Sequence, residues 1–281
     1  MKCVCPILGR PTEVEETGLC RDGWRLVRCC ETGFVFLIDP PVASRLEQEF
    51  AWEKTYALES RRRELAEPLM RRVSLLSKRL RATMLPRYDR MAALTVSVAM
   101  RIEHPGPVCV LDVGCGSGSR MAGIHRSLTA LGRELSPCGI EVSRHLARVS
   151  GSLFSQFGGR VVQALATDAM SMFEPESIDI VVLSSFLEHE HQPLHFSRQA
   201  HSALRASGAV VLKVPNYASW NRYARGQRWC GFRIPDHVNY FTPHTLKLLA
   251  QEAGFRFRQR FWDRSPLSDS MYAVLTKAES H

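Results

Sequence analysis

The stretch "VCVLDVGCGSGSRMAGIHRSLTAL", residues 108–131, decides the fold. Its first six residues are almost all apolar, which predicts a strand that is buried on both faces. Glycines follow at positions 114, 116 and 118, where they allow a sharp turn and a close approach of the backbone to a ligand. Apolar residues then recur at three- and four-residue intervals, which predicts a helix. A strand, a glycine turn and a helix in this order form a unit of a parallel α/β sheet.

The same alternation continues to the end of the chain. Strands are expected over 138–142, 161–168, 178–185 and 208–215, with helices over 143–157 and 193–205. A further helix, 242–255, is ended by Gly254, and two strand candidates follow at 256–262 and 271–278. The pattern predicts an α/β fold with a doubly wound, mainly parallel, seven-stranded Rossmann-like sheet.

Three segments differ in their patterning. Residues 1–45 contain short β-type pieces and turns and are expected to form a small β appendage. Residues 46–105 have a helical pattern interrupted by Pro68 and Pro86, which indicates a helical linker or cap. Residues 106–281 form the α/β domain. We find no internal repeat and no low-complexity tract.

The chain is basic, with a formal net charge of +9 and a pI near 9.3. Its arginines concentrate in residues 59–90, a run that suits an anionic partner such as nucleic acid or a membrane surface. The interpretation that we favour is a solvated helix face, because no nucleic-acid motif accompanies the charge. No apolar run reaches the roughly 18 residues of a membrane span. Nine scattered cysteines and no apolar signal core lead us to expect a cytoplasmic protein.

Acidic residues follow three successive predicted strands at Asp112, Glu141 and Asp168. Open α/β sheets bind ligands at the carboxyl ends of their strands, so these carboxylates are expected at one edge. Asp112 suits a cationic amine, Glu141 suits ribose hydroxyls, and Asp168 suits an adenine amine. Ser119 stands where a dinucleotide fingerprint needs glycine or alanine, so this ligand is not expected to be NAD.

These motifs resemble those of class I S-adenosylmethionine-dependent methyltransferases. The likeness lies in "VLDVGCGSG", "GIEVS", "ATDA" and "SIDIVVLSSFLEH", and it covers residues 85–281. The segment 226–255 resembles the small-molecule branch that includes ubiquinone-type O-methyltransferases. The resemblance implies S-adenosylmethionine as cofactor. The residues that it assigns to the cofactor are Asp112, Gly114, Cys115, Gly116, Gly118, Glu141, Val142, Asp168, Ala169 and Ser184.

Relatives in this branch often begin with a zinc ribbon, and the first 45 residues resemble a degenerate one. Cys5 and Cys29 stand where the first cysteine of each knuckle would be, whereas Leu8 and Thr32 replace the second. Two thiolates do not complete a tetrahedral zinc site, so we expect no zinc here. The alternative is a rewired site that uses other cysteines of this segment, namely Cys3, Cys20 and Cys30.

The histidines of "SSFLEHEHQPLH", residues 184–195, and of the later "PDHVNYF" are candidate catalytic groups. Transfer of a methyl group to a hydroxyl requires a proton acceptor, and histidine suits this role at neutral pH. We therefore predict His189 as the base and His237 as a second candidate; helix capping and loop locking are the structural alternatives. We do not expect Glu188, His189, His191 and His237 to bind a metal, because neighbouring residues point in different directions. The substrate walls are predicted to include Trp220, Trp229, Phe232 and Tyr240.

The predicted function is methylation of a small-molecule hydroxyl on a sugar, a secondary metabolite or a quinone precursor. Two alternatives stay open: an RNA methyltransferase, favoured by the charge, and a relative that binds the cofactor without transferring methyl. A peripheral membrane contact would suit a lipid-like acceptor. Neither the acceptor nor the oligomeric state follows from the sequence, because acceptor pockets are built by variable loops.

Overall fold

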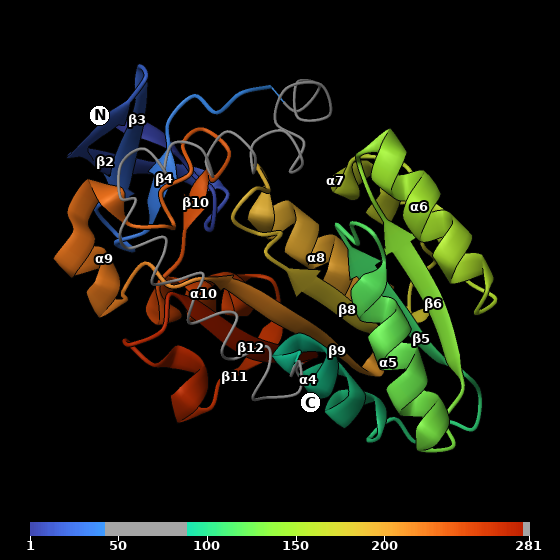
Figure 1. Cartoon of the computed structure of the whole chain (residues 1–281). Helices are drawn as coiled ribbons and strands as arrows, with labels where there is room; N and C mark the ends of the chain where they lie inside the picture. The colour runs from blue at the N-terminus through green and yellow to red at the C-terminus, as the bar shows by residue number, and fades with distance from the viewer. Residues whose placement is uncertain (43–88, 278–281) are drawn as a thin grey trace, which may run out of the picture.

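The computed structural model describes residues 1–42 and 89–277. In this part of the chain the strands form a seven-stranded sheet and a smaller five-stranded sheet (Figure 1). The strand order of the larger sheet is β11-β12-β9-β8-β5-β6-β7. Its first five strands along the chain are parallel and its last two are antiparallel. The expected doubly wound, mainly parallel sheet with a small N-terminal β appendage is confirmed.

The larger sheet alternates strands and helices along the chain. Its strands are β5 (Val108–Val113), β6 (Leu135–Ile140), β7 (Arg160–Val162), β8 (Ile178–Ser184), β9 (Leu204–Pro215), β11 (Phe255–Arg258) and β12 (Ser270–Lys277). The helices around it are α4 (Arg90–Ala99), α5 (Ser119–Ala130), α6 (Arg144–Ser155), α7 (Ala166–Met170), α8 (Pro193–Ala203) and α10 (Pro243–Glu252).

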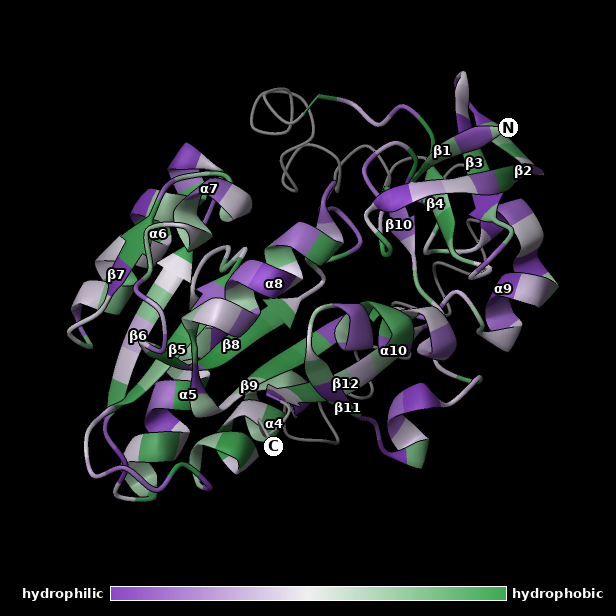
Figure 2. Ribbon diagram, turned by 180° about the vertical axis from the view of Figure 1, so that it is seen from behind, coloured by the Kyte–Doolittle hydropathy of each residue, from purple (hydrophilic) through white to green (hydrophobic). Residues whose placement is uncertain are grey.

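The central strands are buried on both faces, as their apolar runs predict. Figure 2 shows β5 and β8 in the colour of hydrophobic residues. Leu111 and Leu183 belong to the core cluster that includes side chains of α8 and α10. Val110 and Val182 belong to the cluster on the opposite face, with side chains of α4 and α5. Helices on both faces leave the strand ends as the places where loops can form a site.

The N-terminal segment forms the hairpins β1 (Lys2–Cys5), β2 (Arg10–Arg21), β3 (Trp24–Cys29) and β4 (Val35–Leu37). The fifth strand of this sheet, β10 (Asn239–Tyr240), comes from the loop region after β9 and pairs with β4 (Figure 1). Arg21 also donates to the carbonyl oxygens of Phe232 and Gln227, at 3.0 and 3.1 Å. The appendage is therefore attached to the segment that carries Asp236 and His237.

Both knuckle turns of the ribbon-like segment keep the same backbone geometry. Gly9 donates to the carbonyl of Cys5, and Gly33 donates to the carbonyl of Cys29, each at 2.8 Å. Both glycines have positive φ, which a left-handed turn requires. The two turns thus share one geometry, and their assignment to a degenerate zinc ribbon stays a prediction. Whether metal binds here stays a prediction.

Several strand limits differ from those expected, among them those of β6, β7, β9 and β11. The strand predicted over 161–168 ends at Val162, so Asp168 lies in α7 and does not close a strand. The backbone between them turns into a short helix, which apolar patterning alone did not indicate. The strand expected at 208 begins at Leu204, because an irregular register between β8 and β9 extends the pairing.

Most of the helical linker predicted over 46–105, and most of the basic run 59–90, lie outside the described residues; the linker's described part contains α4. The proposed division at residues 45 and 105 therefore stays a prediction. Within the described residues, no helix has the length and apolar character that a membrane span requires.

Candidate active site at the carboxyl ends of the strands

The glycine turn after β5 is held open by its backbone conformation. Gly114, Gly116 and Gly118 have φ values of +67°, +55° and +76°, which disfavour any residue with a side chain. A Cβ at Gly118 would also lie 2.9 Å from the ring of Phe154. The turn therefore keeps its backbone accessible to a ligand and lets α5 and α6 pack closely.

Asp112, the penultimate residue of β5, has a fully buried carboxylate. Neither of its oxygens has a hydrogen-bond partner among the described residues, and the nearest guanidinium nitrogen, of Arg120, is 4.0 Å away. Burial raises the pKa of Asp112 to about 6; Arg120 opposes this rise, whereas Glu141 and Asp89 add to it. A buried carboxylate with so little compensation is a binding site for a cationic group.

Glu141 directly follows β6 and lies beside the glycine turn. Its carboxylate accepts hydrogen bonds from the backbone N–H groups of Gly116, at 2.8 Å, and Ser143, at 2.9 Å. These bonds fix the carboxylate at the strand end and connect two ligand-binding loops. Each carboxylate oxygen has further lone pairs that can accept from a ribose hydroxyl.

These residues fit S-adenosylmethionine, the cofactor that the fold implies. The uncompensated Asp112 suits the amine of the cofactor's amino-acid end, and the fixed Glu141 suits its ribose. Cys115 is buried, and burial raises its thiol pKa to about 12, so it is a neutral turn residue at physiological pH. The other predicted cofactor residues are placed as follows: Val142 and Ser184 are partly buried after β6 and at the end of β8, Ala169 is buried in α7, and Asp168 is exposed in α7.

The turn after β8 brings the candidate catalytic residues to the same edge. A Cβ placed on Gly114 would lie 3.7 Å from the ring of Phe186, so this turn passes close to the glycine turn. The carbonyl of Glu188 accepts from the N–H groups of Val238 and Asn239, at 2.8 and 3.1 Å. The side-chain amide of Asn239 donates to the carbonyls of Leu187 and Glu190, at 2.8 and 2.6 Å. The segment before β10 is thereby fixed against the turn after β8.

Asn239 was not identified from the sequence. Its side chain satisfies backbone carbonyls of a turn about 50 residues earlier, and the local pattern "HVNYF" gives no sign of that partner. Asp269 was missed for the same reason. Its carboxylate accepts from Ser219, Asn221 and the indole nitrogen of Trp229, and so organises the loop after β9.

His189 is oriented by Asp236. The Nδ1 atom of His189 lies 2.9 Å from the carbonyl oxygen of Asp236 and 3.0 Å from its Oδ1 atom. Arg233 contacts the other carboxylate oxygen at 2.6 Å. Burial lowers the pKa of His189, but the charges of Asp236 and Glu188 and the hydrogen bond to Asp236 outweigh it and raise the pKa above its usual value.

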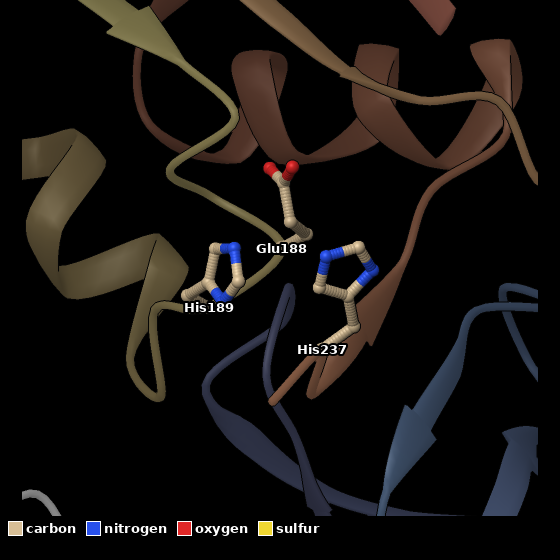
Figure 3. A group of neighbouring side chains, drawn as sticks. All are labelled: Glu188, His189 and His237. Atoms are coloured by element: carbon tan, nitrogen blue, oxygen red, sulfur yellow. The ribbon is translucent and has the colours of Figure 1, made fainter. Parts of the chain in front are cut away.

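His237 lies against His189, with ring centroids 4.7 Å apart and the rings almost perpendicular. Its Nδ1 atom is 2.8 Å from the carbonyl oxygen of Gly231. Burial, and then the positive charge that His189 can carry, lower the pKa of His237 well below its usual value. Figure 3 shows the two rings on either side of the Glu188 side chain, whose carboxylate extends beyond them.

The expectation that these residues would not converge is wrong for three of the four. Ligand-type atoms of Glu188, His189 and His237 all lie within 4.8 Å of one another. The sequence argument treated them as neighbours on one segment, whereas His237 comes from a different loop. His191, the fourth, is not a member of this group among the described residues.

The predicted substrate walls are placed differently from expectation. Trp229 and Tyr240 are buried, together with Phe232, in a cluster with Leu26 and Val35 of the N-terminal sheet, so the assignment of these three rings to an open wall is wrong for this structure. Their aromatic surface fills the junction between the sheets. Trp220 is exposed at the start of α9 (Trp220–Arg225).

Comparison with known proteins agrees with this arrangement. The model of the family described as "Methyltransferase domain" matches residues 58–260, which is more than half of the chain. The chain belongs to this methyltransferase family. Together with the fold and the strand-end acids, the match identifies it as a class I S-adenosylmethionine-dependent methyltransferase.

Two relatives of this methyltransferase are ubiquinone biosynthesis O-methyltransferases. The protein of Cupriavidus pinatubonensis is 27% identical over 153 residues, which are 52% of this chain and 59% of the relative. That of Ralstonia nicotianae is 27% identical over 168 residues, 57% of this chain and 68% of the relative. The match thus spans about three-fifths of the first relative's length.

Solved structures show the same fold at low identity. The CurJ carbon methyltransferase has a TM-score of 0.51 and 13% identity, with coverage of 67% of this chain and 54% of its own. The complex of the Haloferax volcanii Trm112 activator with a methyltransferase also gives a TM-score of 0.51, at 14% identity and with coverage of 68% and 90%. At such identity the likeness concerns the fold alone.

Proposed function

We propose that this methyltransferase transfers the methyl group of S-adenosylmethionine to a hydroxyl oxygen of a small molecule. The acceptor classes that we favour are a sugar, a secondary metabolite or a quinone precursor. The observation that carries the proposal is the pair formed by His189, in the turn after β8 and near the glycine turn, and Asp236, in the segment before β10. The names of the two relatives support oxygen as the acceptor atom and a phenol of the quinone type as one candidate.

When bound, S-adenosylmethionine supplies an electrophilic methyl group on a sulfonium. An acceptor hydroxyl must lose its proton as its oxygen gains the methyl group, and a positioned base removes that proton. Because the carbonyl oxygen of Asp236 can only accept, Nδ1 of His189 carries its hydrogen and Nε2 has the free lone pair. In the metal-free protein, His189 can therefore take the proton at Nε2, and Asp236 stabilises the resulting imidazolium.

His189 is suited to this exchange because it is reachable. Its side chain is 23% exposed, whereas His237 is 5% exposed and its pKa is well below the usual value. We therefore assign the base to His189 and assign His237 to the support of its ring. The two roles differ in what each substitution should change.

The test measures formation of S-adenosylhomocysteine with a panel of hydroxylated sugars and catechol-type phenols. On an identified acceptor, His189→Ala is expected to lower kcat by about 10²–10⁴-fold, the usual contribution of a general base. His195→Ala is the matched control, because His195 is exposed on α8, six residues further along. Full turnover by His189→Ala would show that the base is another group, and absence of S-adenosylmethionine binding would remove the whole proposal.

A further inference from the structure

Glu188, His189 and His237 form a buried group whose ligand-type atoms lie within 4.8 Å of one another. Glu188 and His189 belong to the turn after β8, and His237 belongs to the segment before β10. Glu188 is 1% exposed and His237 is 5% exposed. Figure 3 shows the two imidazole rings on either side of the Glu188 side chain.

The hydrogen bonds of the two rings determine what faces this space. Nδ1 of His189 and Nδ1 of His237 each approach a carbonyl oxygen, of Asp236 and Gly231 respectively. A carbonyl oxygen has no hydrogen, so both Nδ1 atoms must be the donors. A neutral imidazole has a single N–H group, and both Nε2 atoms therefore present lone pairs.

Glu188 adds a third acceptor to the group. Its Oε2 atom is buried and has no hydrogen-bond partner among the residues that the structure describes. Three acceptors thus meet without a donor between them. One proton can bridge two such atoms, whereas a divalent cation can bind all three. Buried polar atoms that lack protein partners are rare and point to an ion or a ligand.

We infer that Glu188, His189 and His237 bind one divalent transition-metal ion. Two imidazoles and one carboxylate are a ligand set of zinc and of non-haem iron(II), and cobalt(II) can replace either as a probe. The surroundings also fit, because metal-bound histidines usually donate their second nitrogen to a carboxylate or a carbonyl. His189 donates to Asp236, and His237 donates to Gly231.

Only small movements are needed to close the site. Ligands at about 2.1 Å from a tetrahedral ion are about 3.4 Å apart, so the present separations must shrink by about 1.4 Å at most. Side-chain rotation provides such a shift. Three protein ligands leave the ion a coordination position on the open side, where His189 is partly exposed.

The role of the ion rests on the proposed function, since the acceptor hydroxyl is taken to approach His189. Coordination of that hydroxyl to the ion lowers its pKa, and its proton passes to solvent on the open side. The oxygen then forms its bond to the methyl carbon as the carbon–sulfur bond breaks. In this metal-loaded state His189 is a ligand, and no separate base is required.

The test is a cobalt(II) titration of the full chain after dialysis against a chelator. We expect one ion per chain, visible absorption bands of nitrogen and oxygen ligation, and no thiolate-to-cobalt absorption in the near ultraviolet. The last criterion separates this site from the N-terminal cysteines, which would ligate through sulfur. Uptake of no cobalt, or uptake with thiolate absorption alone, overturns the inference.

Variants locate the ion. Glu188→Gln and His237→Ala are each expected to weaken cobalt binding at least tenfold, whereas His195→Ala leaves it unchanged. Glu188→Gln keeps the shape of the side chain, and circular dichroism of both variants verifies their fold. If cobalt binding is unchanged in both variants, the ion lies elsewhere and the inference is wrong.

Two further measurements separate this inference from the proposed function. S-adenosylmethionine is titrated into the metal-free protein, because the cofactor residues lie outside the metal group. Intact cofactor binding without cobalt binding removes only the metal site. The turnover of the chelated protein is expected to fall at least tenfold and to return with zinc or cobalt, and full turnover without metal overturns the role given to the ion.

Discussion

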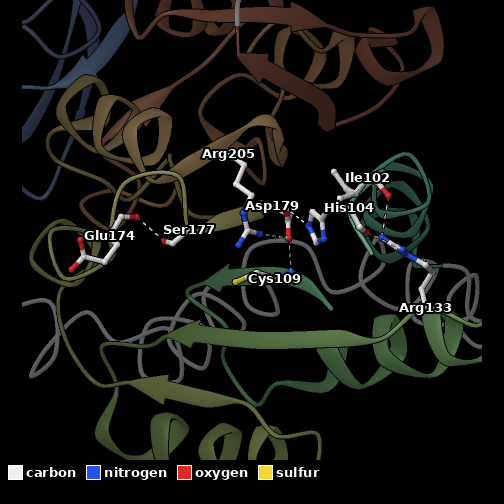
Figure 4. Close-up of polar contacts among 8 residues, drawn as sticks. All are labelled: Ile102, His104, Cys109, Arg133, Glu174, Ser177, Asp179 and Arg205. Atoms are coloured by element: carbon white, nitrogen blue, oxygen red, sulfur yellow. Dashed lines mark hydrogen bonds and ion pairs between the residues drawn. The ribbon is translucent and has the colours of Figure 1, made fainter. Parts of the chain in front are cut away.

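A buried carboxylate lies near each end of strand β8, and the two differ in how completely they are hydrogen-bonded. Near its start, Asp179 accepts from Nε2 of His104 at 2.9 Å, from the backbone N–H of Cys109 at 2.8 Å and from Arg205 at 2.7 Å (Figure 4). Arg133 closes the same region by donating to the carbonyls of Ile102 and His104, at 3.0 and 3.4 Å. Every oxygen of the Asp179 carboxylate has a partner.

At the other end of the sheet, buried carboxylates have oxygens without hydrogen-bond partners in the described part of the chain. One oxygen of Glu188 and both oxygens of Asp112 have no hydrogen-bond partner among the described residues. Leaving a buried polar group unsatisfied costs about 1–3 kcal/mol, so three such atoms at one edge weaken the fold unless something binds there. The comparison indicates that one end of β8 serves stability and the other serves ligand binding.

The largest effect is expected from Asp179→Ala, which should lower the free energy of unfolding by about 3 kcal/mol. The substitution leaves the backbone N–H of Cys109 and the side chains of His104 and Arg205 without their common acceptor. Urea unfolding measures the loss, and Glu188→Gln is the comparison. One oxygen of Glu188 is buried without a hydrogen-bond partner among the described residues. Its replacement in Glu188→Gln should therefore change the free energy of unfolding by less than about 1 kcal/mol. Equal losses for the two variants would contradict the division of roles.

Asp112→Asn is expected to stabilise the protein and impair cofactor binding. The pKa of Asp112 is raised from its usual 3.8 to about 6 in the folded protein, so ionisation opposes folding. The loss of folding free energy caused by this ionisation is absent below pH 3.8 and complete above pH 6, where it reaches at most about 3 kcal/mol. Thermal unfolding at pH 8 should therefore show a higher Tm for the variant, with no difference near pH 3.5.

Cofactor affinity should change with pH for the same reason. Asp112 must be ionised to bind an amine, so below pH 6 the protein must release a proton as S-adenosylmethionine binds. We expect the affinity to fall by up to about tenfold per pH unit below pH 6. Calorimetric titration between pH 5 and 8 checks this, and Asp112→Asn serves as the control because its weaker affinity should lack this slope. A flat profile in the unsubstituted protein would place the amine elsewhere.

The two ends of β8 also differ in how far the sequence predicts them. The strand, the glycine turn and the acids Asp112 and Glu141 follow from local patterns, because burial and turn geometry restrict the residues at each position. Asp168 is predicted to close a strand but lies in helix α7, because short apolar runs occur both in strands and at the starts of helices. The partners of Asp179 come from three other segments, and nothing near Asp179 indicates them.

The group of Glu188, His189 and His237 shows the same limit. His189 follows from its position after a strand, but its meeting with His237 depends on the amide of Asn239 and on the pairing of β10 with β4. That pairing also explains why Trp229 and Tyr240 are core residues and not substrate walls. Such contacts link segments about 50 to 200 residues apart, and a single sequence contains no signal for them.

The smallest effect that we predict concerns Arg21, which helps to attach the N-terminal sheet to the segment that leads to His237. Its guanidinium donates to the carbonyls of Phe232 and Gln227, in the segment that leads to His237. Arg21→Ala should lower the free energy of unfolding by about 1 kcal/mol and raise the KM for the acceptor several-fold. The affinity for S-adenosylmethionine should be unchanged, because the two carbonyls that Arg21 binds lie in the loop region after β9 and not in the glycine turn. Arg21→Lys should restore stability only in part, since one ammonium group lacks the planar fork that spans two carbonyls. Equal changes in the binding of cofactor and acceptor would show that the appendage supports the whole domain and not its acceptor side.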